Sequence, residues 1–103
     1  MQFVKNFPIT PLETFLEQSG KVTDFTSSKG HKYEVIDIED NIMQFLRLDT
    51  GSSEPWHMEL EKVYLAYQEL ESFYTLSFKK YVPRKHSPAR GLLIHLKMLV
   101  PKI

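Results

Sequence analysis

The stretch HKYEVIDIEDNIMQFLRL, residues His31–Leu48, decides the fold class of this chain. Its two halves, His31–Ile38 and Ile42–Leu48, are rich in the β-branched and aromatic residues that strands favour. Asp40-Asn41 between them is typical of a turn, because both side chains can hydrogen-bond to the nearby backbone. We therefore predict a β-hairpin.

The residues after the hairpin predict a third strand. Apolar and polar side chains alternate from Trp56 through Met58 to Leu60, as in a strand with one buried face. A competing interpretation starts a helix here, with Ser53 as its N-cap and Pro55 close behind. The alternation favours the strand.

Helical patterns flank these strands. Thr10-Pro11-Leu12-Glu13 has the form of a capping box, with Thr10 as N-cap and Gly20 as the stop of a short helix. A second helix is predicted from about Leu60 to Glu71, where apolar residues recur with the spacing of one helix face. Phe25–Lys29 is predicted to be a loop.

The C-terminal third predicts two further helical pieces. Thr75 caps a short turn of helix, which ends at Pro83. Ser87-Pro88 then repeats the cap-plus-proline start of the first helix. The last helix is predicted to continue through Val100 until Pro101 stops it.

Strands followed by helices predict an α+β fold in a single domain, residues 1–103. We expect an N-terminal helix, a three-stranded antiparallel β-meander, and two to three C-terminal helices packed on one sheet face. The apolar positions of these elements define the predicted core, which is Leu12, Phe15, Leu16, Tyr33, Val35, Phe45, Trp56, Val63, Tyr67, Leu70, Phe78, Leu92, Leu96 and Leu99.

The composition excludes several classes of protein. Hydrophobic residues make up 42% of the chain and aromatic residues 13%, which argues against disorder. Cysteine is absent from the sequence, so disulfides, thiolate metal sites and thiol nucleophiles are excluded. The N-terminal residues lack the apolar core of a signal peptide, and no apolar run has the length of a membrane span. We expect a cytoplasmic protein with no membrane partner.

Charge is divided unevenly along the chain. Ser72–Ile103 contains seven Lys or Arg residues and no Asp or Glu, whereas the first 71 residues contain six against thirteen. The formal net charge of zero therefore conceals an acidic part and a basic part. Such asymmetry favours an anionic partner, an internal acidic neighbour or self-association.

The basic segment 79–90 is the candidate site. A helix N-terminus presents unpaired N–H groups and partial positive charge, and arginine adds donors that fit phosphate oxygens. We predict contact with nucleic acid or another polyanion here, with Tyr81 available for stacking. The predicted site residues are Lys79, Lys80, Tyr81, Arg84, Lys85, His86, Ser87 and Arg90. The alternative is a solvated loop whose charges offset nearby acids, such as Glu34, Asp37, Glu39 and Asp40.

Aromatic residues give a second candidate function. Phe73, Tyr74, Phe78 and Tyr81 fall within nine positions of one another, which is abundant for one small core. Surplus aromatics are favoured at protein interfaces. Together with the charge asymmetry, they suggest a protein-interaction or adaptor domain that forms a homodimer.

A third candidate is a metal-dependent hydrolase built on the acidic half. Asp37, Asp49, Glu59 and Glu61 could supply carboxylates, and His57-Met58-Glu59 places a His and a Glu on one face of a strand. However, thirteen acids allow such sets to be drawn in many places, and the zinc-deaminase pattern also needs cysteines. We therefore expect no catalysis, no cofactor and no metal site.

Overall fold

The predicted hairpin is formed by strands β3 (Lys32–Glu39) and β4 (Ile42–Arg47). Asp40 and Asn41 connect them with positive φ angles of 53° and 61°. A turn with positive φ at both central residues matches the twist of the two strands it joins. The hairpin is thus specified locally, as the sequence indicated.

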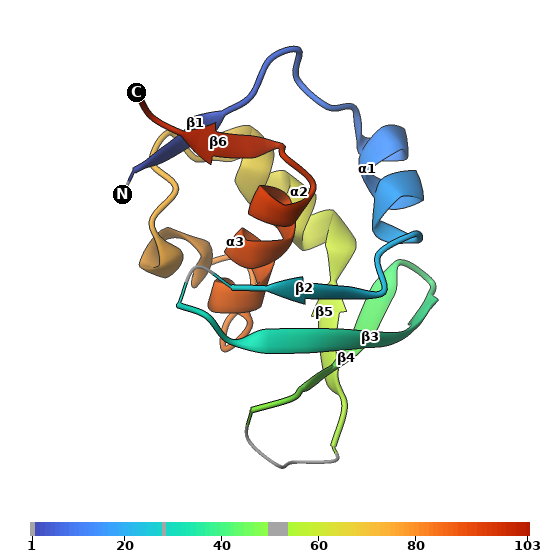
Figure 1. Ribbon diagram of the computed structural model, residues 1–103. Coiled ribbons are helices and arrows are strands. Elements are labelled where there is room, and N and C mark those ends of the chain that lie inside the picture. Colours follow the sequence, from blue (N-terminus) through green and yellow to red (C-terminus); the bar gives the residue numbers. More distant parts are fainter. Residues whose placement is uncertain (1, 28, 50–53) are drawn as a thin grey trace.

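The computed structural model describes residues 2–27, 29–49 and 54–103. Strands β2, β3, β4 and β5 form one antiparallel sheet in that order, and β1 pairs with β6 in a second, two-stranded sheet (Figure 1). These sheets and three α-helices confirm a mixed α+β domain. The remaining elements are β1 (Phe3–Lys5), α1 (Leu12–Ser19), β2 (Asp24–Thr26), β5 (Trp56–Glu59), α2 (Leu60–Glu69), the short 3-10 helix η1 (Thr75–Phe78), α3 (His86–His95) and β6 (Leu99–Pro101).

The strand interpretation of the third apolar stretch is confirmed. Trp56–Glu59 pairs antiparallel with β4, and Met58 is buried opposite Met43. The backbone N–H of Leu60 donates to Asn41 O, and α2 begins at this same residue. The strand therefore passes directly into the helix without a connecting loop.

The predicted loop at Phe25–Lys29 is wrong over its first residues. Asp24–Thr26 forms β2, which pairs with β3 and makes the sheet four-stranded. Phe25 lies opposite Tyr33 and is buried. A strand of three residues with one buried side chain has too little alternation to be recognised from the sequence.

The predicted course of the last helix is also wrong. Helix α3 ends at His95, and Lys97 then takes a left-handed conformation with φ 62°. Leu99–Pro101 forms β6 beside β1, near the opposite end of the chain. Apolar residues at the end of a helix pattern can continue as a strand when a distant partner strand is present, and β1 is that partner.

The capping box at the start of α1 does not form. Pro11 is the N-cap, and no side chain caps the helix. Thr10 is instead bound to α2: its N–H donates to the Tyr67 hydroxyl over 3.2 Å, and its carbonyl accepts from the Tyr64 hydroxyl over 2.7 Å. Tertiary contacts thus replace the local cap.

The core follows the predicted set with one clear exception. Leu12 is 37% exposed, because Phe15 is the side chain of α1 that packs into the core. Leu16, Val35, Trp56, Leu70 and Leu96 are partly buried against the core. The other predicted core residues are buried, as are several that were not predicted, including Phe25, Met43, Met58, Leu60, Phe73, Leu93 and Met98.

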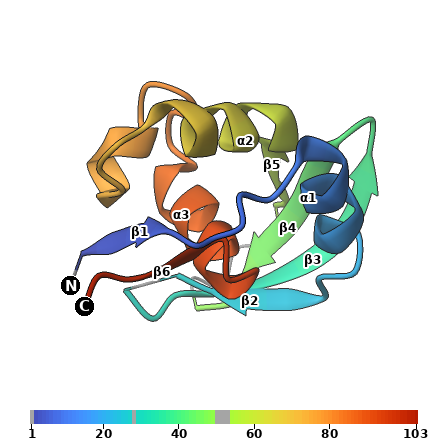
Figure 2. The ribbon, with the colours of Figure 1, turned by 90° about the horizontal axis from the view of Figure 1, so that it is seen from above.

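The four-stranded sheet has one buried face and one exposed face. Tyr33, Phe45 and Met58 point into the core, while Glu34, His57 and Glu59 are exposed. The helices lie above the sheet in Figure 1, and the view from above shows α1 in front of β3 and β4 (Figure 2). Side chains alternate along a strand, so every second residue of β4 faces the helices. In β3 the register shifts between Val35 and Asp37, so that Ile38 lies opposite the buried Met43.

Candidate cationic site at the start of helix α3

The first part of the basic segment, residues 79–81, lines none of the three hollows described below. Lys79 and Lys80 are exposed in the turn after η1. The Tyr81 hydroxyl donates to Glu69 Oε1 over 2.9 Å, and the Lys80 ammonium lies 5.8 Å from the Tyr81 ring centre. The hydrogen bond to Glu69 raises the pKa of Tyr81. Tyr81 is therefore held by its own neighbours.

Arg90 is buried and makes its contacts within the fold. Only 6% of the residue is exposed. Its Nε donates to the carbonyl oxygen of Phe73 over 2.6 Å, and its guanidinium lies 4.8 Å from the centre of the Phe3 ring. Burial lowers its pKa. We therefore leave Arg90 out of the candidate site, because its donors face the interior.

Arg84, His86 and Ser87 meet residues from the sheet around a hollow of about 210 Å³, which we name the α3 hollow. Five of its nine lining residues are basic types, and no carboxylate among the described residues lines it. Its lining consists of Lys29, His31, Tyr33, Arg47, Trp56, Arg84, His86, Ser87 and Pro88. The hollow is therefore suited to an anion.

Strand alternation explains why basic residues face this hollow. His31 precedes Tyr33 by two positions, and Arg47 follows Phe45 by two, so both share the side of the sheet that carries the core. Tyr33 and Arg47 are direct partners across β3 and β4. These polar side chains therefore lie at the edge of the buried sheet face, next to the first residues of α3.

Two polar atoms at the start of α3, Nδ1 of His86 and Oγ of Ser87, are buried and make no hydrogen bond within the described residues. The Ser87 side chain lies close to Tyr33, where it opposes the rise in the pKa of that hydroxyl that burial causes. The helix N-cap is Lys85, and it makes no side-chain cap bond. The first turn of a helix also leaves backbone N–H groups without intrahelical partners. Buried polar groups are normally paired, so both atoms keep unused hydrogen-bonding capacity beside the hollow.

Asp49 lies beside the hollow and neutralises part of its charge. The Arg47 Nε donates to one carboxylate oxygen over 2.7 Å, and the other oxygen lies 2.7 Å from His31 Nδ1. These contacts, with Arg47 first, lower the pKa of Asp49 to about 2. The same hydrogen bond raises the pKa of Arg47. Arg47 and His31 are thereby fixed in orientation at the sheet end.

Arg84 projects between this hollow and a second one. Its backbone is left-handed, with φ 67°, a conformation that costs a non-glycine residue roughly 1–3 kcal/mol. The second hollow, of about 370 Å³, is named the tryptophan hollow and is lined by Pro55, Trp56, His57, Arg84 and Lys85. Trp56 and Arg84 therefore border both spaces.

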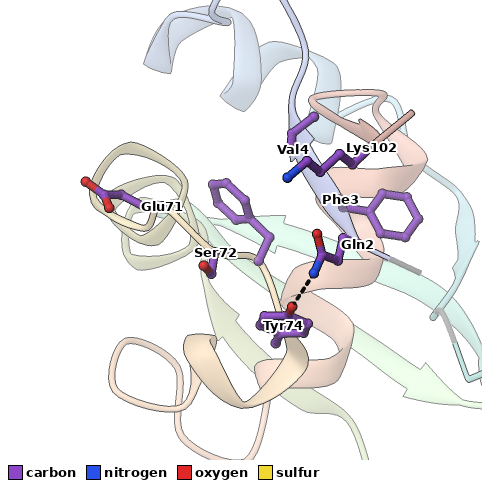
Figure 3. A pocket seen from close by; sticks show the side chains of 8 residues that line it. Gln2, Phe3, Val4, Glu71, Ser72, Tyr74 and Lys102 are labelled. Carbon is purple, nitrogen blue, oxygen red and sulfur yellow. Dashed lines mark hydrogen bonds between the residues drawn. The ribbon is translucent and has the colours of Figure 1, made fainter.

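A third hollow, of about 280 Å³, lies beside β1 and is named the β1 hollow (Figure 3). Gln2 Nε2 donates to the Tyr74 hydroxyl over 2.8 Å at this hollow. Its lining is Gln2, Phe3, Val4, Glu71, Ser72, Phe73, Tyr74 and Lys102, with one acidic and one basic residue. The mixed charges give it no preference for an anion or a cation.

The carboxylates considered for metal chemistry do not gather. Within residues 2–27, 29–49 and 54–103, no group of three His, Asp or Glu side chains could hold a metal ion. His57 and Glu59 are exposed on β5, and Glu59 pairs with Lys62 over 3.0 Å. In the same parts of the chain, no helix is long and apolar enough to cross a membrane.

Comparison with protein-family models, with curated proteins and with solved structures found no match. The site must therefore be interpreted from its own residues. The sequence did not single out Lys29, His31 or Arg47 for the site, and Trp56 was predicted for the core and counted among the aromatics near the interface candidates, not for this site. For His31 and Arg47, the available signal was their even spacing from core residues of the same strands.

Proposed function

We propose that this protein binds the phosphate groups of a nucleic acid at the α3 hollow and the adjoining Lys85. The observation that carries the proposal is the lining of the hollow, with five basic residues and no carboxylate among the described residues. Positive charge gathered in a hollow attracts polyanions and makes their binding sensitive to salt.

The unpaired atoms at the start of α3 support the same proposal. A phosphate oxygen would accept from the Ser87 hydroxyl and from free N–H groups of the first helical turn. The Arg84 guanidinium provides paired donors for the remaining oxygens. Burial raises the pKa of Tyr33, so its hydroxyl keeps its proton at neutral pH and can donate as well.

The alternative of a loop neutralised by the acidic strand lacks supporting contacts. Among the described residues, no ion pair joins Arg84 or Lys85 to a carboxylate. Glu34 and Asp37 are exposed on β3. The positive charge at the start of α3 is therefore not offset by direct pairing within the described structure.

The aromatic residues favour an interface less than the sequence suggested. Phe73 and Phe78 are buried in the core, and Tyr81 is half-buried with its hydroxyl bound to Glu69. Tyr74 is exposed, yet its hydroxyl accepts from Gln2. These contacts account for the aromatic cluster within the fold, so we do not propose an adaptor function.

A fluorescence-anisotropy titration tests the proposal with labelled single-stranded and duplex DNA and RNA. We expect binding at about 50 mM salt that weakens by orders of magnitude at about 200 mM if several phosphates are contacted. Absence of binding at the lower salt concentration would rule the proposal out. An affinity that does not change with salt concentration would show that phosphate contacts contribute little to binding.

Two double variants with equal charge change locate the contact. Arg84→Ala with Lys85→Ala removes two cations at the hollows, whereas Lys79→Ala with Lys80→Ala removes two exposed cations elsewhere on the segment. We expect the first pair to lower the slope of log affinity against log salt by about 2, since each phosphate contact contributes about 0.9. Equal losses in both variants would overturn the proposed location.

A further inference from the structure

We infer that the nucleic acid bound here is single-stranded and that one of its bases stacks on Trp56. This inference rests on the proposed phosphate contacts and names the class of ligand. Single strands expose the faces of their bases, which stack on aromatic side chains in proteins that track the backbone through a positive groove. Trp56 is the aromatic residue that borders both the tryptophan hollow and the α3 hollow.

The position of Trp56 is fixed by the core beneath it. Its ring centre lies 5.8 Å from that of Phe45 and 6.3 Å from that of Tyr33. The residue is only half-buried, so part of the side chain reaches the surface. An aromatic ring held on one side by the core and open on the other loses little freedom when a base stacks on it.

Cations line both of the hollows that Trp56 borders. Arg84 borders the two hollows, Lys85 borders the tryptophan hollow, and Lys29 lines the α3 hollow. A strand whose base rests at Trp56 would therefore meet positive charge for the phosphates that flank it. Alternating aromatic and basic contacts suit a chain of alternating bases and phosphates.

The sizes of the two hollows favour parts of a chain over a complete small molecule. The α3 hollow of about 210 Å³ is smaller than a usual ligand pocket, and the tryptophan hollow of about 370 Å³ is near the lower limit. A phosphate and one base occupy less space than a drug-sized ligand. Bases in a duplex are already stacked on each other, so their faces are not available to Trp56.

Trp56 is the only tryptophan in the sequence, which makes its intrinsic fluorescence a direct probe of stacking. The wild-type protein is titrated with three ligands at about 50 mM salt. These are an oligothymidylate of about 12 nucleotides, an abasic strand of equal length, and a duplex. We expect oligothymidylate to quench the emission, and the abasic strand and duplex to leave it nearly unchanged. Anisotropy of labelled ligands measures binding in parallel.

The abasic strand separates this inference from the proposed function, because it carries the phosphates without the bases. Equal affinity for the abasic strand and oligothymidylate, with no quenching, would overturn the stacking inference and leave phosphate binding intact. Preferential binding of the duplex would overturn it as well. Failure to bind any of the three ligands would overturn both proposals.

A Trp56→Leu variant provides a second readout. Leucine keeps apolar contact with Phe45 but removes the aromatic face. We expect the affinity for oligothymidylate to fall roughly five- to a hundredfold, as for one lost base stack, and the affinity for the abasic strand to stay the same. Equal loss for both ligands would contradict stacking. If the variant does not fold, as circular dichroism would show, the wild-type quenching experiment still decides the question.

Discussion

The β1 hollow and the α3 hollow differ in how the polar groups at and beside them are used. At the β1 hollow, Gln2 binds Tyr74, and Arg90 of α3 donates to Phe73 and stacks on Phe3. At the α3 hollow, His86 Nδ1 and Ser87 Oγ have no partner, and basic residues surround them. The two hollows are of comparable volume, about 280 and 210 Å³.

The difference teaches that positive charge can serve two purposes within one basic segment of the sequence. Arg84 and Arg90 belong to the same basic segment, yet Arg84 is exposed and Arg90 is buried with its guanidinium against an aromatic ring. Substitutions at the β1 hollow should therefore change stability first, whereas substitutions at the α3 hollow should change ligand binding first.

The largest effect is expected from Arg90→Met. This change removes the donor to Phe73 O and the stack on Phe3. We expect a loss of about 2–4 kcal/mol in the free energy of unfolding, because a buried carbonyl loses a charged donor. Urea denaturation measures it. A loss below about 1 kcal/mol would show that the contacts of Arg90 contribute little to stability.

A smaller loss is expected from Gly91→Ala, which alters the approach of α3 to β2. A Cβ at Gly91 would lie 2.9 Å from the Cα of Ser27, so the backbone of one element must move. We expect destabilisation by about 1–3 kcal/mol despite the better helix propensity of alanine. Gly20→Ala is the comparison: its φ is −64° and its Cβ would lie 3.3 Å from the Glu17 carbonyl oxygen, so a smaller shift suffices and the loss of stability in thermal unfolding should be smaller than for Gly91→Ala.

Arg84→Gly should change stability and binding in opposite directions. Glycine adopts the left-handed conformation at this position without strain, so we expect a gain of about 0.5–1 kcal/mol in the free energy of unfolding. Binding of single-stranded DNA should weaken, with the slope of log affinity against log salt lower by about 0.7. Lys97→Gly makes the same charge change at another left-handed residue, and it should stabilise without weakening binding.

The smallest effect is expected from Asp49→Asn and appears in acid. The folded-state pKa of Asp49 is lowered to about 2, so its stabilising contribution is complete above the ordinary value of 3.8 and is lost as the pH falls toward 2. The melting temperature of the variant should therefore fall less steeply than that of the wild type across this range.

At neutral pH, Asp49→Asn should also tighten DNA binding modestly, because it removes a negative charge beside the α3 hollow. Glu34→Gln makes the same charge change on the exposed face of β3 and serves as the control. An equal change in the acid unfolding profile of both variants would contradict the role given to the contacts with Arg47 and His31.

The candidate site could be predicted only in part from the sequence. The charge pattern placed Arg84, Lys85, His86 and Ser87 in one segment, and the structure brings all four to the two adjoining hollows. Arg90 could not be separated from them, because burial depends on the distant contacts with Phe3 and Phe73. Lys79, Lys80 and Tyr81 were grouped by proximity in sequence, but they line neither hollow.

The sequence by itself determined the β3–β4 hairpin, the strand at Trp56 and the helix that follows it. Their signals are local: turn residues at Asp40 and Asn41, alternation along a strand, and helical spacing of apolar residues. Only the tertiary structure decided the pairing of β1 with β6 and the addition of β2 to the sheet. It also decided the α3 hollow, which joins Lys29, Arg47 and Ser87. Short strands, and hollows lined by several elements, depend on contacts between residues far apart in the chain. Local propensity does not specify those contacts.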